Sequence, residues 1–422
     1  MDDLEAVDWF FDPSVHQDPY PYYEYLRAKG PAVRLPKYNV VAVTDYDEAL
    51  RVFRDDESYS FVKSGTGPFP PLPFTPEGDD ITAQIEAHRQ SVPGAALLMS
   101  MDAPRHPALR SLLMGIITPK RLKENEEFIV RFAKNQVDSA VSRGRFEAVK
   151  DLSHPMATLV IADLLGLPEG LHSQLLDMLP PPSSQVGGAR RVASFNPLEE
   201  LDAALSEFIV ERRRSPQVDV LTNLAQAKFP DGSMPEIKDV VSLASFLFAA
   251  GQDTTVRLIA LCLRILGDDQ ELQKRLRGDR GKIVAFVEEV LRFESPSKNG
   301  AFRLAKVRTQ VGGVEIMPGD LVVPLIAAAN RDPSRFDRPA EFSIDRPNHH
   351  DHLAFGRGAH TCLGGPLARA EARIALNCLF DRTSEIRISE AAHGPLEARR
   401  YEYWPGYTAR SLKELYVEVT PA

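Results

Sequence analysis

Apolar residues near the start of the chain are spaced first as in helices and then as in strands. Residues 20–30 have helical spacing up to a terminal glycine, and residues 45–56 begin with an aspartate, a residue type that caps helix N-termini. Between them, the runs AVRLP (32–36) and VVAVT (40–44) are rich in β-branched residues. We therefore predict a pair of strands flanked by two helices.

Most of the remaining pattern is helical, with one stretch of strands and two irregular segments. Residues 102–291 are mainly helical, whereas residues 309–332 indicate short strands joined by turns. Residues 64–78 are rich in proline, which excludes regular helix, and residues 180–197 are also irregular. The phenylalanines near the first segment favour an ordered loop over an apolar site rather than a surface excursion. The chain is predicted to be mainly α with a minor β portion.

The longest predicted helix lies between Ser233 and Gly267. Ser233 and Glu236 have the spacing of a capping box, and Gly267 follows the last apolar turn. A helix of this length, roughly 50 Å, must run through the body of the protein. At its centre, AAGQDTT (249–255) contains residue types that are poor in helix interiors. Two interpretations stay open: a threonine hydroxyl bonds to the carbonyl of Ala250 and opens a groove for a ligand, or the segment is a polar patch facing solvent.

The composition is ordinary for a soluble protein: the chain has 422 residues, of which 43% are hydrophobic. No stretch approaches the run of apolar residues that a membrane span needs, and the acidic N-terminus lacks the layout of a signal peptide. The net charge of −9 discourages nucleic-acid binding as a main role. We expect a cytoplasmic protein with no membrane anchor and no nucleic-acid partner.

The three cysteines, Cys262, Cys362 and Cys378, form no CxxC pair, and the histidines form no HExxH motif. A disulfide framework and a zinc site therefore have no support. Cys362 differs from the other two because it closes the glycine-rich loop AFGRGAHTCLG and precedes a helix-like run. Backbone N–H groups at a helix N-terminus lower the pKa of a thiol. Three interpretations stay open: a metal ligand, a catalytic thiol with His360 as base, or an inert cysteine.

A charged pair in the segment EEVLR (288–292) is predicted to be exposed. Ile283, Phe286 and Val287 belong to the apolar stripe of this helix, and Glu289 and Arg292 lie off it. Pairs of this spacing on a helix surface contribute a few tenths of a kcal/mol. Periodicity alone gives the pair no special role.

Taken together, five motifs resemble those of the cytochrome P450 family. FGRGAHTCLG resembles the cysteine loop of the family at all six fixed positions, and AGQDTT resembles its oxygen-binding helix motif. EVLR resembles the Glu-x-x-Arg pair, FSIDR the meander segment, and APRHPALR an early segment that contacts haem. They occur in family order over roughly residues 102–364, a combination far more specific than any one motif.

The resemblance implies the cytochrome P450 fold, as one domain over residues 1–422 with a β-rich N-terminal part and an α-rich body. Haem b (iron protoporphyrin IX) would lie between the long central helix and the helix after Cys362, whose thiolate would be the axial iron ligand. Phe355 would shield the sulfur, and four residues would bind the propionates. The implied haem contacts are His106, Arg110, Arg303, Phe355, His360, Cys362 and Gly364.

The resemblance also assigns roles in the central helix and in the Glu-x-x-Arg pair. Ala250 and Gly251 would form an oxygen groove, where Thr254 holds an ordered water and Asp253 connects it to solvent. The resemblance further implies a buried structural network of three residues, whereas periodicity predicts that the pair is exposed. Its members would be Glu289, Arg292 and Arg346.

The implied activity is monooxygenation of a hydrophobic small molecule with O2, by a monomer that takes electrons from NAD(P)H through a separate ferredoxin and reductase. Alternatives are a peroxide-driven haem-thiolate oxygenase, a haem sensor and a cysteine hydrolase. A basic patch for the ferredoxin would use Arg357, Arg369 and Arg373, although these are otherwise ordinary solvated charges. The expected substrate pocket comprises Phe69, Phe74, Phe246, Leu247, Ala249 and the segment 297–301, including Asn299.

Overall fold

The computed structural model describes residues 4–35, 37–115, 118–178 and 197–422. Its helices are α1 Pro13–Gln17, α2 Tyr20–Lys29, α3 Tyr46–Arg54, α4 Thr82–His88, α5 Arg105–Met114, α6 Pro119–Val141, α7 His154–Leu165, α8 His172–Met178, α9 Pro197–Arg214, α10 Val220–Ala225, α11 Ile237–Asp268, α12 Gln270–Gly278, α13 Ile283–Phe293, α14 Ile326–Ala329, α15 Gly365–Arg382 and α16 Glu390–His393. Its strands are β1 Ala32–Leu35, β2 Val40–Val43, β3 Tyr59–Ser60, β4 Arg145–Glu147, β5 Arg303–Ala305, β6 Thr309–Val311, β7 Val314–Ile316, β8 Leu321–Pro324, β9 Thr383–Ile388 and β10 Tyr416–Pro421.

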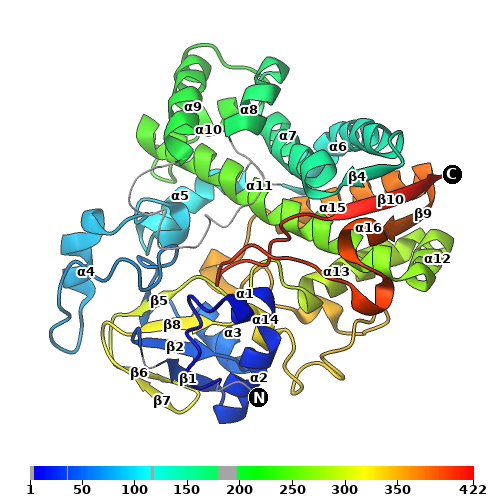
Figure 1. Ribbon diagram of the computed structural model, residues 1–422. Coiled ribbons are helices and arrows are strands. Elements are labelled where there is room, and N and C mark those ends of the chain that lie inside the picture. The colour runs from blue at the N-terminus through cyan, green and yellow to red at the C-terminus, as the bar shows by residue number, and fades with distance from the viewer. Residues whose placement is uncertain (1–3, 36, 116–117, 179–196) are drawn as a thin grey trace.

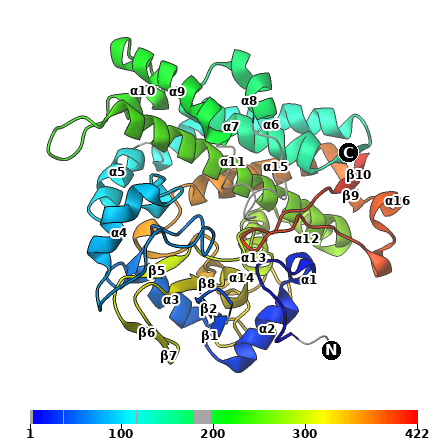
Figure 2. The ribbon, with the colours of Figure 1, turned by 60° about the vertical axis from the view of Figure 1, so that its left-hand side comes forward.

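Helix α11 crosses the middle of the molecule and separates two parts of different structure (Figure 1). Helices α6 to α10 lie on one side of it, and the sheet with α1, α2, α3 and α14 lies on the other; the rotated view shows the same division (Figure 2). Helix α15 packs against α6, α11 and α13. The predicted mainly α architecture with a minor β portion is confirmed.

The predicted strands at 32–36 and 40–44 are present as β1 and β2 and belong to a five-stranded sheet. The strand order is β1-β2-β8-β5-β3, in which only β2 and β8 are parallel. All four residues of β2 are buried, as expected for a strand covered on both faces. The outer hairpin β6–β7 turns at Gly312 and Gly313, whose φ values of 55° and 82° favour glycine. The sheet places β5, and with it Arg303, beside the centre of the molecule.

Both helices predicted near the N-terminus are present. Helix α2 ends before Gly30, which has a φ of 153°. Helix α3 begins after Asp45, whose carboxylate accepts a hydrogen bond from the backbone N–H of Glu48 at 2.9 Å. The proline-rich segment 64–78 contains no helix or strand, as predicted. The second irregular segment, 180–197, lies outside the described residues except for its last position.

Helix α11 is confirmed as the longest helix in the described part of the chain, but its predicted N-terminus is wrong. The Ser233 hydroxyl bonds to Asp231 at 2.6 Å, and Glu236 precedes the helix without a side-chain cap. Among the described residues, α11 is also the one helix long and apolar enough to cross a membrane, which corrects the expectation that no such stretch exists. In the fold, 67% of its most apolar 18 residues are buried against other elements. Its apolar character is that of a core helix.

Candidate functional site

A cavity of about 340 Å³ lies between α11 and the loop that precedes α15. Its walls come from distant parts of the sequence: α5, the middle of α11, the segment that leads into β5, and the glycine-rich loop. Most of the lining is apolar, including Leu98, Ile161 and Leu247. The fold therefore brings the cysteine loop and the AGQDTT segment to one cavity, as the resemblance implied.

The glycine-rich loop presents Cys362 to the cavity. The backbone N–H of Cys362 donates to the Phe355 carbonyl at 2.9 Å, which closes the loop. Gly358 has a φ of 78°, and a Cβ there would lie 2.4 Å from the Phe53 carbonyl oxygen. Only glycine fits at this position, because both the backbone conformation and the close approach exclude a side chain.

Burial raises the pKa of the Cys362 thiol, although the backbone N–H groups of Gly364 and Gly365 and the charge of Arg110 act in the opposite direction. The prediction of a lowered thiol pKa is therefore wrong for the protein alone. The loop and the helix N-terminus do favour the thiolate, but the protein packed around the sulfur outweighs them, although the side chain of Cys362 is exposed to the cavity. A positive charge bound in the cavity would complete the stabilisation of the thiolate. No group of three or more metal-ligating side chains occurs among the described residues.

Aromatic and cationic side chains form a continuous stack at one edge of the cavity. The rings of His106 and His360 stack with centroids 3.6 Å apart, and His360 stacks on Phe61 at 3.5 Å. The Arg303 guanidinium lies 3.8 Å from the centroid of the Phe61 ring on the other side. Arg110 lines the same cavity and donates to the Thr361 carbonyl. The sequence pointed to Phe61 only as one of the phenylalanines that favour an ordered loop over an apolar site; its place in this stack depends on residues from distant segments.

The electrostatics of this edge fit an anionic group. Burial, and then the charge of Arg110, lowers the pKa of His106 to about 4. Burial lowers the pKa of Arg303 to about 10, and burial with the charges of His106 and Arg303 lowers that of His360 to about 2. His106 Nε2 and Arg303 Nε are buried without a hydrogen-bond partner among the described residues. Two carboxylates placed here would supply the missing acceptors, so these residues fit the propionates of a haem.

The predicted hydroxyl–carbonyl contact in the middle of α11 is present. Thr254 Oγ1 donates to the Ala250 carbonyl at 3.0 Å, and both residues line the cavity together with Gly251. The helix nevertheless continues without a break through this segment. Asp253 lies beside the cavity and not on its wall; its carboxylate pairs with Arg257 at 2.5 Å. Arg257 is buried and also donates to Ser411 in the C-terminal segment.

The Glu-x-x-Arg pair is fully buried, so the exposure predicted from periodicity is wrong. Arg292 donates to both carboxylate oxygens of Glu289, at 2.8 and 2.7 Å. Arg346 donates to Glu289 at 3.3 Å, which confirms the network expected from the resemblance. Arg292 also donates to the carbonyls of Asn330, Pro339 and Glu341. The pair lies off the apolar stripe because it packs against this second, polar layer.

Sequence reasoning passed over Glu288, which lies on the cysteine side of the cavity. Its carboxylate accepts hydrogen bonds from Arg369 at 2.6 and 2.8 Å and lies 3.2 Å from His352 Nε2. Burial raises the pKa of Glu288, but Arg369 and His352 outweigh it and hold the pKa at about 2. The Arg369 guanidinium stacks on Phe355 at 4.4 Å. The signal available in the sequence was the position of Glu288 directly before Glu289 in EEVLR.

The predicted basic patch is less basic than its sequence suggests. Arg369 pairs with Glu288, and Arg373 pairs with Glu126 at 2.6 Å. Arg357 donates to two backbone carbonyls. Arg369 and Arg373 keep 37% and 38% of their side chains exposed, so both still present charge to solvent.

Only part of the predicted substrate pocket lines the cavity. Phe246, Leu247 and Asn299 do. Phe69 instead packs on Phe10, Phe11 and Tyr38, and Phe74 stacks on His88. Ala249 is also outside the lining. The prediction is therefore corrected for Phe69, Phe74 and Ala249. Contacts of Phe69 with the N-terminal region and of Phe74 with His88 of α4 order the proline-rich segment away from the cavity, and Ala249 lies on α11 outside the lining.

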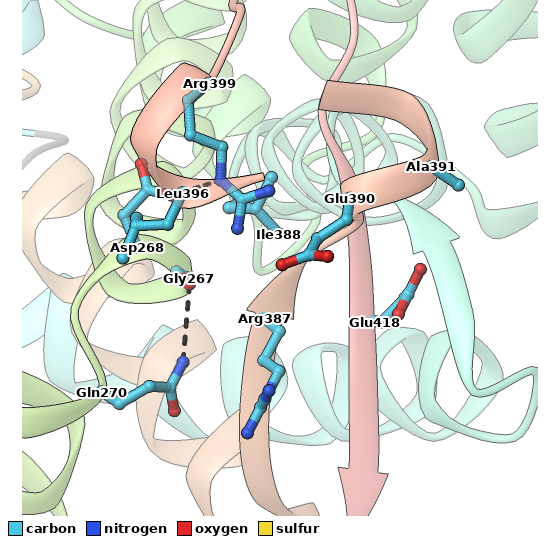
Figure 3. Close-up of a pocket in the computed structure, with 10 residues that line it drawn as sticks. All are labelled: Gly267, Asp268, Gln270, Arg387, Ile388, Glu390, Ala391, Leu396, Arg399 and Glu418. Atoms are coloured by element: carbon cyan, nitrogen blue, oxygen red, sulfur yellow. Dashed lines mark hydrogen bonds and ion pairs between the residues drawn. The ribbon is translucent and has the colours of Figure 1, made fainter. Parts of the chain in front are cut away.

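A second cavity, of about 530 Å³, lies at the C-terminal end of α11 (Figure 3). Most of its charged lining side chains already have partners: Arg399 pairs with Asp268 at 3.1 Å, and Glu418 accepts from Ser389 at 2.6 Å. Arg387 pairs with a glutamate of its own strand, at 2.7 Å. Neither the cysteine nor the threonine of the first cavity reaches it, so the chemistry belongs to the first cavity.

Comparisons with known proteins agree with this site. The family model "Cytochrome P450" matches residues 124–384, more than half of the chain. The structure of Mycobacterium marinum cytochrome P450 CYP150A6 in the substrate-free form is 49% identical, with a TM-score of 0.93, and the match covers 99% of this chain and 100% of that one. A biotin biosynthesis cytochrome P450 of Bacillus subtilis is 32% identical over 95% of this chain and 96% of its own length. With relatives so similar along almost its whole length, the chain belongs to the cytochrome P450 family of haem-thiolate monooxygenases.

Proposed function

We propose that this protein inserts one oxygen atom from O2 into an apolar small molecule, with Cys362 as the axial ligand of a haem. The observation that carries the proposal is the placement of Cys362 and Thr254 on one apolar cavity whose edge is cationic. When bound there, haem iron supplies the activation of O2. His106, Arg110, Arg303 and His360 would hold its propionates, while Phe355 and Gly364 support the sulfur.

We propose that polar groups of α11 deliver protons from solvent to the cavity. Thr254 stands exposed at the cavity wall, where its hydroxyl can hold a water while it donates to the Ala250 carbonyl. Asp253 is one residue away and reaches solvent, with 21% of its side chain exposed. A proton taken from solvent at the Asp253 carboxylate would pass through that water into the cavity. Arg257 fixes the orientation of Asp253 and is a positioning residue in this scheme.

Replacing Thr254 with alanine is expected to uncouple electron use from product formation. The variant should bind haem normally, because the hydroxyl contacts only its own helix. Loss of the held water slows proton delivery, so electrons are diverted to hydrogen peroxide. We expect product per NADH to fall at least about tenfold, within the usual contribution of a positioned proton donor. Parallel measurement of NADH, product and peroxide checks this, and an unchanged ratio would exclude the role.

The class of reaction can be tested with two measurements on the purified holoenzyme. Thiolate ligation predicts a strongly red-shifted Soret band when the ferrous protein binds carbon monoxide. Turnover with NADH, a ferredoxin and its reductase tests the electron supply. A peroxide-driven oxygenase would instead form product from hydrogen peroxide alone, and a haem sensor would form none under either condition.

The apolar walls support a hydrophobic substrate, because such a pocket gains affinity by removing apolar surface from water. One solved relative, CYP109E1 from Bacillus megaterium, was determined in complex with testosterone; it is 28% identical, with a TM-score of 0.78 and coverage of 95% of this chain and 99% of that one. A screen of terpenoid, steroid and aromatic compounds for changes in iron spin state would identify the class.

Electron transfer from the proposed ferredoxin is expected to depend on Arg373. Replacing it with alanine leaves Glu126 unpaired on the cysteine side and should slow association with an acidic donor several-fold at low salt. At about 1 M salt, where the screening length is about 3 Å, the difference should vanish. Stopped-flow reduction of the haem measures both rates. Arg308→Ala, which disrupts an exposed pair with Glu315 on the β6–β7 hairpin, is the matched control and should leave reduction unchanged.

A further inference from the structure

Glu288 joins two helices on the cysteine side of the cavity. It lies on α13, and only 7% of its side chain is exposed. Its two carboxylate oxygens accept hydrogen bonds from Arg369 of α15 at 2.6 and 2.8 Å. The same carboxylate lies 3.2 Å from His352 Nε2, so it is held from two sides in one orientation.

His352 connects this carboxylate to the beginning of the glycine-rich loop. The ring is buried, and burial lowers its pKa, so the ring is neutral. Its Nδ1 accepts the backbone N–H of Ala354 at 3.2 Å, so Nε2 carries the proton and donates it to Glu288. The next residue, Phe355, supplies the carbonyl that accepts the Cys362 N–H at 2.9 Å. Two hydrogen bonds therefore join Glu288 to the segment that closes the loop around the sulfur.

Arg369 brings a positive charge close to this sulfur. Its guanidinium stacks on the Phe355 ring, 4.4 Å from the centroid, and a Cβ on Gly365 would lie 3.2 Å from its Nη1. The backbone N–H of Gly365 also acts on the Cys362 sulfur. The protein packed around the sulfur raises the pKa of the thiol, and the charge of Arg369 is among the effects that oppose this rise. Arg369 therefore acts on the sulfur through space.

Glu288 compensates the charge of Arg369. An uncompensated cation beside a thiolate would stabilise the anion and weaken the electron donation that favours O–O cleavage. An uncompensated carboxylate would act in the opposite sense. The two parallel hydrogen bonds keep the charges together, so the pair is neutral as a whole. Because only 37% of the Arg369 side chain is exposed, solvent screens the pair incompletely.

We propose that the Glu288–Arg369 pair, held in place by His352, sets the electron density at the Cys362 sulfur and thereby the reduction potential of a haem bound there. The proposal rests on the proposed function, because it needs Cys362 as the iron ligand. Neither member of the pair lines the cavity, so both act without touching the substrate. Glu288 is a positioning residue that acts through Arg369.

The reduction potential of the substrate-free holoenzyme tests this proposal. Dye-mediated titrations are followed by the Soret band at about pH 8, well above the usual pKa of a carboxyl group. Reduction adds one electron to the iron, so a nearby positive charge raises the potential and a negative charge lowers it. Glu288→Gln leaves Arg369 uncompensated and should raise the equilibrium constant for reduction about tenfold, which is ~59 mV for one electron. Arg369→Gln leaves the carboxylate uncompensated and should lower this constant by a similar factor.

The double variant, Glu288→Gln with Arg369→Gln, restores a neutral pair and should lie close to the wild type. Opposite shifts distinguish this role from a structural one. A pair that only supported the loop would shift both single variants in one direction, with loss of the red-shifted carbon monoxide band in each. That result, unchanged potentials, or a double variant further from the wild type than either single variant would overturn the proposal.

The matched control is an exposed pair on the same helix. Arg382 pairs with Asp138 of α6 at 2.7 Å, with 49% of each side chain exposed. Arg382 lies roughly 20 Å beyond Arg369 along α15, so salt should screen its charge, and Arg382→Gln should leave the potential unchanged. A shift equal to that of Arg369→Gln would overturn the proposal.

Two outcomes concern the protein itself. If Glu288→Gln does not retain haem, Arg369→Gln serves as the readout, and an unchanged potential in that variant overturns the proposal. Absence of the red-shifted carbon monoxide band in the wild type would instead contradict the proposed function.

Discussion

Replacing Cys362 with serine is expected to abolish both the red-shifted Soret band of the carbon monoxide complex and detectable monooxygenation. Cys362 provides the one thiol that lines the cavity within the described residues. Serine preserves the size of the side chain and the loop closure through the Phe355 carbonyl. A hydroxyl stays protonated where the thiol, assisted by Gly364 and Gly365, can be stabilised as an anion. The electron donation that favours O–O cleavage is then lost.

The matched control is Cys378→Ala, which removes a thiol from α15 away from the cavity. Cys378 is buried in the core, and burial raises its pKa. The variant should keep the spectrum and the activity, apart from a modest loss of stability typical of a small core truncation. If Cys362→Ser keeps a red-shifted band and normal turnover, Cys362 is not the ligand. The spectrum reports on ligation directly, so a failure of substrate binding cannot imitate this result.

Replacing Glu289 with glutamine is expected to produce the largest loss of stability among the site variants. The side chains of Glu289 and Arg292 are both fully buried, and Arg346 bonds to the same carboxylate. Removing the one carboxylate leaves two buried guanidinium groups without a counter-charge. Breaking a buried pair in this way destabilises a protein by about 3–5 kcal/mol. The midpoint of urea unfolding, followed by circular dichroism, should fall clearly, and haem retention should fall with it.

The control for this variant is another glutamate with a cationic partner three residues later. Glu271 pairs with Lys274 on α12 at 3.2 Å, and about three-quarters of both side chains is exposed. Glu271→Gln should change stability by less than about 0.5 kcal/mol, because water screens such pairs. Equal effects of the two substitutions would mean that the buried network contributes nothing beyond an ordinary surface pair.

Local motifs in the sequence predicted the parts of the site that one segment builds. The bond from Thr254 to the Ala250 carbonyl lies within one helix turn, and the loop around Cys362 needs glycines that the sequence displays. Strands β1 and β2 were predicted from their own β-branched residues. In each case the determining contacts lie within a few residues or follow from residue type.

Predictions failed where partners come from elsewhere in the chain. Glu289 is buried together with Arg292, whose guanidinium donates to backbone carbonyls within residues 330–341. The periodicity of the helix does not reveal these distant acceptors. Phe69 does not line the cavity because its ring packs on those of Phe10 and Tyr38. The sign of the Cys362 pKa shift depends on the protein that the fold packs around the cavity-facing sulfur, which the loop sequence alone does not determine. Motif resemblance corrected the Glu289 prediction but not the other two.

At its C-terminal end, α11 makes a close contact with β9. A Cβ at Gly267 would lie 2.5 Å from Ile388 Cδ1 and 3.1 Å from the Ile388 nitrogen, so even alanine does not fit without movement (Figure 3). Gly267 is thirteen residues from Thr254, about 20 Å along a helix. Because α11 packs on β9 at this contact, an added side chain would have to displace Ile388 or the end of the helix. The close seating of α11 on β9 therefore depends on the absence of a side chain at one position.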